Sequence, residues 1–264
     1  HRDLHSFPTR RSSDLFASRW TPGALAATHL LTVGFMLQIM LGALIQILPV
    51  VAGANLARPL AVATGVHAGL TLGGLALAGG LYFSFPDGLV AAAVLLGFSV
   101  LGFLVATVRA LIGLPSSSPT VLGLKLSLLG LLGVVGTGLV LALSLAWGWA
   151  VPLIDLANLH AAWGLGAWAG ILLAAVAFVV VPMFQLTPGY PARPAWGLPS
   201  LVMFALLWWT AGFWQDWPLA VRSALALLAL GGLAFAGMTL RLQARRRRAR
   251  VDATARYWQG GLAL

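Results

Sequence analysis

Residues 156–184 read LANLHAAWGLGAWAGILLAAVAFVVVPMF and contain no Asp, Glu, Lys or Arg. A helix of about 20 apolar residues is long enough to cross the hydrocarbon core of a bilayer. Lipid offers the backbone no hydrogen-bond partner, so such a segment must pair its own N–H and C=O groups. The stretch therefore predicts a transmembrane helix. It decides the fold class because six other stretches have the same character.

Short connections rich in Gly, Pro, Asn and Ser separate these stretches. None of the apolar stretches shows the alternating polarity over about 10 residues that a membrane β-barrel strand requires. We expect spans over residues 24–51, 60–83, 89–114, 121–147, 156–184, 198–214 and 219–240. The sequence thus predicts an all-α fold, a polytopic transmembrane helical bundle of about seven spans.

The composition excludes several functional classes. Hydrophobic residues make up 60% of the chain and charged residues 8%, whereas soluble domains are about a quarter charged. The absence of cysteine excludes disulfides, thiolate metal sites, iron–sulfur clusters and covalently attached c-type haem. The net charge of +10 is concentrated in two short runs and at span ends, which is typical of membrane topology and not of nucleic-acid binding.

Three parts are expected along the chain. Residues 1–15 are interpreted as an artefact of sequence assembly, because residues 5–15 (HSFPTRRSSDL) look like a translated sequencing adapter; His1 and His5 are therefore excluded as site residues. A genuine basic tail is the alternative. Residues 16–242 form a single transmembrane domain. Residues 243–264 form a cytoplasmic basic segment and the start of a further span, so we expect both ends to be truncated.

The arginine distribution predicts the orientation in a bacterial cytoplasmic (inner) membrane. The cluster after the seventh span is placed on the cytoplasmic side; it comprises Arg241, Arg245, Arg246, Arg247, Arg248 and Arg250. Counting spans back places Arg58, Arg109 and Arg193 on the same side, with Asp87, Asp155 and Asp216 opposite; Arg19 and Arg222 are exceptions. The cluster is interpreted as a topology signal, with an anionic-lipid site as the alternative.

Three histidines, His29, His67 and His160, lie inside the predicted spans. Ionisable groups at this depth are costly, so each is a functional candidate; the alternative is a neutral ring hydrogen-bonded to a neighbouring helix. His29 and His160 lie in the outer parts of spans one and five, which run in the same direction. Two such imidazoles, with glycines nearby, suit the axial positions of haem b. Close helix packing is the alternative role of those glycines.

His67 belongs to a helical stripe with Thr64, Thr71 and Gly74, which we expect to face the bundle interior. It is a candidate ligand, and a hydrogen bond across helices explains it equally well. A weaker pattern is a Pro–Gln pair about 20 residues after His29 (Gln46 and Pro49) and again after His160 (Pro182 and Gln185). This pattern hints at an internal repeat, and helix termination also explains it.

Two strings, THLLTVGFMLQIMLGALIQILPVVAG at 28–53 and LHAAWGLGAWAGILLAAVAFVVVPMFQLTPGYP at 159–191, carry a resemblance. They resemble bacterial membrane proteins distantly similar to haem–copper oxidase subunit I and to NnrS-type haem proteins, over most of residues 24–190. The resemblance implies that His29 and His160 hold a low-spin haem iron. The sequence also departs from the oxidases, because it lacks their tandem His pair, their additional copper His and their tyrosine-linked His. A complete copper site is therefore not expected.

The preferred function is a haem-b-binding membrane protein for electron transfer or for handling oxygen or nitric oxide. Its partners would be the bilayer and a membrane redox partner or a second copy, with no nucleic acid. One alternative is a transporter or channel, whose interrupted helices line a path. Another is a non-catalytic membrane assembly subunit in which the histidines are only hydrogen-bonded. Whether the chain is an enzyme is left open.

Overall fold

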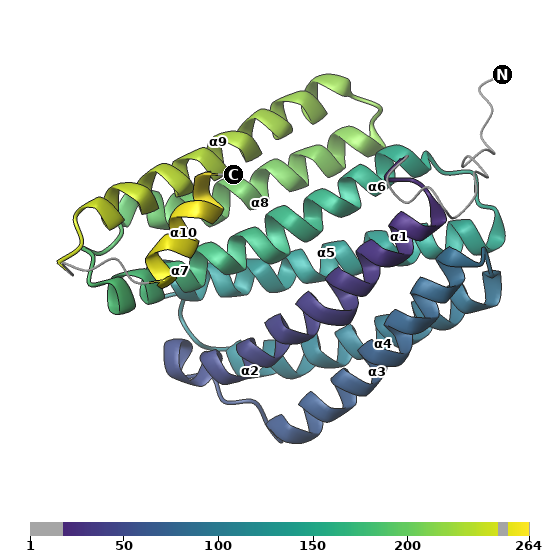
Figure 1. Ribbon diagram of the computed structural model, residues 1–264, viewed down its shortest axis with the longest axis horizontal. Helices are drawn as coiled ribbons and strands as arrows, with labels where there is room; N and C mark the ends of the chain where they lie inside the picture. Colours follow the sequence, from purple (N-terminus) through teal and green to yellow (C-terminus); the bar gives the residue numbers. More distant parts are fainter. Residues whose placement is uncertain (1–17, 248–252, 264) are drawn as a thin grey trace. The chain divides into compact units, whose positions relative to one another are not determined.

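The computed structural model describes residues 18–247 and 253–263, and every regular element in these residues is helical (Figure 1). Seven helices are long and apolar enough to cross a membrane, which confirms the predicted all-α membrane fold. They are Pro22–Ala52, α3 (Pro59–Tyr82), α4 (Pro86–Leu111), α5 (Pro119–Trp147), Leu153–Gln185, α8 (Ala192–Trp214) and α9 (Pro218–Ala244). A shorter helix, α10 (Ala253–Ala263), follows them.

Proline sets the start of most spans. Five of the seven begin at a Pro, namely Pro22, Pro59, Pro86, Pro119 and Pro218. The first helical position tolerates proline because its N–H would have no partner in the helix and its fixed φ suits the helix. These starts lie a few residues before the predicted ones, because the helices begin ahead of the apolar runs that mark the spans in the sequence. The largest difference is at α8, which begins at Ala192 and carries Pro199 inside the helix.

The chain divides into two compact units, the first comprising residues up to Leu114 together with Val135–Ala157. In this unit α3 and α4 form an antiparallel hairpin that packs through glycines (Figure 1). A Cβ at Gly73 would lie 2.8 Å from Leu96, and one at Gly80 would lie 2.8 Å from Leu89. Small residues let helix backbones approach closely, which supports packing where the surrounding lipid is as apolar as the side chains.

The second unit comprises Pro115–Val134 and Asn158–Leu264. Here α8 and α9 form a hairpin, and the span Leu153–Gln185 runs antiparallel to the first part of α5. A Cβ at Gly123 would lie 2.7 Å from Ala175, and one at Gly130 would lie 2.6 Å from Ala167. The last helix, α10, turns back onto the bundle, where Trp258 packs against a cluster from α7, α8 and α9 (Figure 1).

The two units share one architecture. Span one consists of α1 (Pro22–His29), the π-helix η1 (Leu30–Leu37) and α2 (Gln38–Ala52). Span five consists of α6 (Leu153–Ala162), the π-helix η2 (Trp163–Gly170) and α7 (Ile171–Gln185). Both π-helices have 8 residues and both following α-helices have 15. A helical hairpin follows each span, α3–α4 in one unit and α8–α9 in the other.

The correspondence between the two spans is closest in their second α-helices, α2 and α7. Pro49 and Pro182 occupy the same place in α2 and α7, and each helix ends on a left-handed residue, Gly53 (φ 66) or Leu186 (φ 52). The glycine adopts this conformation at little cost, whereas the leucine is strained. Gln46 and Gln185 do not occupy equivalent places, so the proline, and not the Pro–Gln pair, marks the repeat that the sequence hinted at.

Candidate functional site

His29 is the last residue of α1, immediately before η1, and its side chain is half-buried. Its Nδ1 lies 2.8 Å from the carbonyl oxygen of Leu25, one turn earlier in the same helix. A carbonyl oxygen can only accept a hydrogen bond, so this contact places a proton on Nδ1, and in the neutral ring the lone pair is then on Nε2. Histidines that bind a metal through Nε2 commonly have this arrangement, because the second nitrogen fixes the ring through a carbonyl.

His160 lies in α6, three residues before η2, and it is also half-buried. Its Nδ1 lies 3.0 Å from the carbonyl oxygen of Val134 in α5. The same argument places the proton on Nδ1 and the lone pair on Nε2. His29 and His160 therefore have the same tautomer, although one ring is oriented by its own helix and the other by a neighbouring helix.

Trp163 fixes the helix one turn beyond His160. The Trp163 indole N–H donates to Thr210 Oγ1 of α8 at 3.1 Å, and the Thr210 hydroxyl donates to the Leu206 carbonyl at 2.7 Å. The indole ring lies directly over Gly133 of α5, where an added Cβ would collide with it. The start of η2 is thus held by α5 on one side and by α8 on the other.

The glycines near the two histidines have different surroundings. A Cβ at Gly34 in η1 would meet no atom within 4 Å, so this position is open. A Cβ at Gly164 would lie 3.2 Å from Val134, and one at Gly166 would lie 3.4 Å from Leu206. Close helix packing therefore accounts for Gly164 and Gly166, whereas no neighbouring atom restricts a side chain at Gly34.

His67 is exposed on α3, and the structure does not bring it close to His29. Gly74 of α3 packs against Gly34 of η1, where the two antiparallel helices meet. His67 is seven residues from this contact in one direction and His29 is five residues from it in the other. At a rise of about 1.5 Å per residue, the two histidines are separated by about 18 Å along the helices.

The stripe predicted to face the interior does so over half of its length. Gly74 is buried, and the hydroxyl of Thr71 is buried without a hydrogen-bond partner. Thr64 and His67 are exposed on the first half of α3, where α2 packs little against that helix. The expectation of an interior-facing stripe is therefore wrong for these two residues, and His67 stays a predicted ligand without an observed neighbour to support it.

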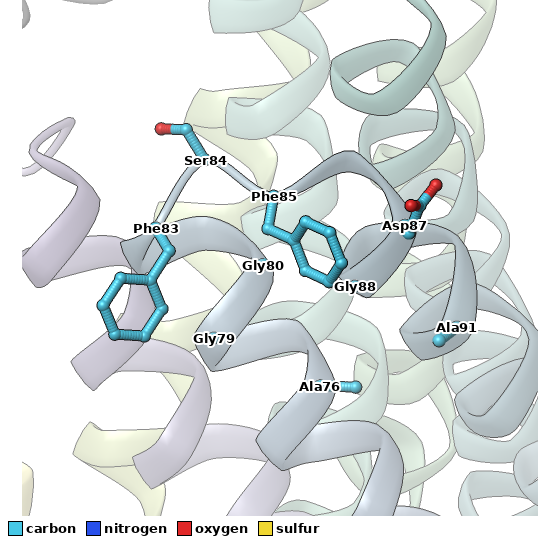
Figure 2. A pocket seen from close by; sticks show the side chains of 9 residues that line it. All are labelled: Ala76, Gly79, Gly80, Phe83, Ser84, Phe85, Asp87, Gly88 and Ala91. Atoms are coloured by element: carbon cyan, nitrogen blue, oxygen red, sulfur yellow. The ribbon is translucent and has the colours of Figure 1, made fainter.

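A hollow of about 690 Å³ lies at the turn between α3 and α4 (Figure 2). The Phe85 ring covers Gly80 and Gly88, while Phe83 points the other way. Asp87 lies in the first turn of α4, where a carboxylate interacts favourably with the helix dipole. No candidate histidine lines this hollow, and its glycine and aromatic walls are explained by the tight turn.

Two polar features were not recognised in the sequence. Gln185 and Gln243 are buried, and their carboxamides have no hydrogen-bond partner. Close to them in the chain, the Tyr190 hydroxyl is 2.8 Å from Thr239 Oγ1. Burial raises the pKa of Tyr190, and the hydrogen bond with Thr239 acts in the opposite direction. In the sequence, each of these glutamines is recognisable only as a Gln at the end of an apolar run. Exposed glutamines at the membrane interface occupy the same kind of position, so the sequence does not reveal the burial.

Acidic and histidine side chains do not cluster in the described ranges: no three of them gather closely enough to hold a metal ion together. The site features that remain are the two histidines of matching tautomer, each next to a π-helix. No protein-family model, curated protein or solved structure matches this chain.

Proposed function

We propose that this chain is an integral membrane haem-b-binding protein in which His29 and His160 would hold the haem iron, and that it serves electron transfer or the handling of oxygen or nitric oxide. One observation carries the proposal: both rings donate Nδ1–H to a backbone carbonyl, which places the lone pair of each on Nε2. Both histidines also lie within one helical turn of a π-helix, an element found frequently at functional sites.

The donor set fits the cofactor. Haem iron takes imidazole nitrogen in its axial positions, and haem supplies one-electron chemistry when bound. The Leu25 and Val134 carbonyls hold the two rings in orientation and make the ligand nitrogens more basic. The apolar side chains of the spans exclude water and lower the local dielectric constant. These are the contributions that a protein makes to the potential of a bound haem.

The proposal includes a bacterial inner-membrane location with the basic end of α9 in the cytoplasm. The support is the positive-inside rule applied to Arg241, Arg245, Arg246 and Arg247, which lie in or just after the last turns of α9.

A visible spectrum of the purified protein, expressed with haem supplementation, tests the proposal. We expect a Soret band and a sharp reduced α-band, and we expect His29→Ala and His160→Ala each to lose the low-spin spectrum. His67→Ala is the matched control, since it removes an intramembrane histidine that is exposed, and it should retain the spectrum. A colourless wild-type protein would refute haem binding, and an unchanged spectrum in either ligand variant would refute the assignment.

The repeat favours a transporter as the second candidate. Interrupted helices in corresponding positions of two repeats mark binding sites in transporters. The π-helices η1 and η2, with Pro49 and Pro182 beyond them, form such a pair. A colourless protein that catalyses proton uptake in proteoliposomes, and loses this activity in His29→Ala, would support the transporter.

A further inference from the structure

The helices α7 and α9 end side by side in the second unit. The backbone N–H of Arg247 donates to the carbonyl of Leu186, the residue after α7, at 3.0 Å. The N–H of Arg246 donates to the carbonyl of Gln243 at 3.3 Å, so the chain folds back over the end of α9. This arrangement brings Gln185, the last residue of α7, and Gln243, in the last turn of α9, to the same end of the unit.

Both glutamines are buried in a way that native proteins avoid. Gln185 is 3% exposed and Gln243 is 2% exposed, and neither the Nε2 nor the Oε1 of either side chain has a hydrogen-bond partner. A carboxamide removed from water without a partner destabilises the fold, and such groups normally point to a missing polar partner. Four unpartnered amide atoms at one end of two adjoining helices therefore indicate a bound polar group.

The charges at this end favour an anion. Arg245, Arg246 and Arg247 follow α9 directly, and within the described residues they form no ion pair. Their three positive charges exceed the partial negative charge that the C-terminal ends of α7 and α9 contribute. Guanidinium groups bind phosphate through paired N–H donors, and their remaining N–H groups are suitable partners for amide Oε1 atoms.

The same end also has an apolar wall. Phe178 of α7, Phe235 of α9 and Trp258 of α10 belong to one cluster that includes Val181. Tyr190 packs edge-on against Phe178, with ring centroids 5.0 Å apart. Arginines and amides next to aromatic and aliphatic side chains at the end of membrane spans match an amphiphile with an anionic head.

We propose that the ends of α7 and α9 form a binding site for the phosphate group of an anionic membrane lipid. The Nε2 atoms of Gln185 and Gln243 donate to phosphate oxygens. The guanidinium groups of Arg246 and Arg247 balance the charge, and the lipid chains lie along the apolar cluster. Basic pockets between transmembrane helices are a known type of site for phosphate head groups. The site is independent of haem binding, since it uses neither histidine.

The test compares thermal unfolding in three nanodisc preparations: phosphatidylcholine alone, phosphatidylcholine with phosphatidylglycerol, and phosphatidylcholine with added inorganic phosphate. For the wild-type protein we expect phosphatidylglycerol to raise Tm by about 5 °C, as ligand linkage predicts for a protein of this size. The double variant Gln185→Met/Gln243→Met should lose this rise. In phosphatidylcholine alone its Tm should be equal to or above that of the wild type, because the unpartnered amides are gone.

The exposed Gln46 at the end of span one provides the matched control, and Gln46→Met should keep the full phosphatidylglycerol effect. Native mass spectrometry of a single Gln243→Met variant gives the same information if the double variant does not fold, through reduced retention of phosphatidylglycerol. No rise in the wild type, or a full rise in the double Met variant, would overturn the site. An equal rise with inorganic phosphate would overturn the lipid as its source.

Discussion

At the scale of single residues, the tautomers of His29 and His160 are the most informative feature. The place of each histidine in an apolar run made both rings candidates in the sequence. It did not reveal the carbonyls of Leu25 and Val134 that orient them, because every residue carries a carbonyl and the contact depends on packing. The same limit applies to Gln185 and Gln243, whose burial follows from neighbours distant in the chain.

Gly133 provides a prediction at this scale. Replacing it with Ala forces a methyl group into the Trp163 ring, which the Thr210 hydrogen bond holds in place. We expect Gly133→Ala to destabilise the protein by about 1–3 kcal/mol, as overpacking does elsewhere. Thermal unfolding in detergent measures the effect. Gly136→Ala in the same helix meets no atom within 4 Å and should not destabilise, so equal Tm values for the two variants would contradict the packing described.

At the scale of elements, the sequence predicted the seven spans well and their internal geometry poorly. Hydropathy measures whether a segment suits lipid, and it does not distinguish α- from π-helical hydrogen bonding, so η1 and η2 were not foreseen. The prolines that begin five of the spans lie outside the apolar runs, so hydropathy does not include them in the helices. The place of Pro49 and Pro182 in their spans was visible, but its meaning as a repeat required the helix boundaries on both sides.

Gly53 and Leu186 end their helices in the same left-handed backbone conformation. Substitutions at these two positions should therefore change the stability in opposite directions. Gly53→Ala should lower stability by about 1 kcal/mol, since a Cβ disfavours this conformation. Leu186→Gly should raise stability by up to about 1 kcal/mol, because strain is relieved while chain entropy is lost. Tm shifts of opposite sign would support the repeat, and a loss of stability in both variants would count against it.

At the scale of the whole molecule, the chain divides into two compact units, each with a π-interrupted span and a helical hairpin, while the single transmembrane domain over residues 16–242 stays a prediction. The two units share little sequence beyond a proline and apolar character, because many apolar side chains satisfy lipid and helix packing equally well. The repeat is therefore apparent in the geometry of the helices before it is apparent in their residues.

The proposed orientation can be tested with single cysteines, because this sequence contains no cysteine. Ala57 and Ser84 are exposed at opposite ends of α3. A membrane-impermeant maleimide should label Ser84→Cys in intact spheroplasts and should label Ala57→Cys after the membrane is opened. The reverse pattern would place the arginines of α9 outside, and labelling of both from one side would contradict α3 as a span.

Helix α5 follows the first three spans in the chain and precedes the last three, and this position affects how the chain inserts into a bilayer. A group of three crossings finishes on the opposite face of a bilayer from where it started, so a directly fused copy would be inserted upside down. The lone helix α5 adds a fourth crossing and restores the starting face. A chain without this helix would insert its last three spans in the inverted orientation.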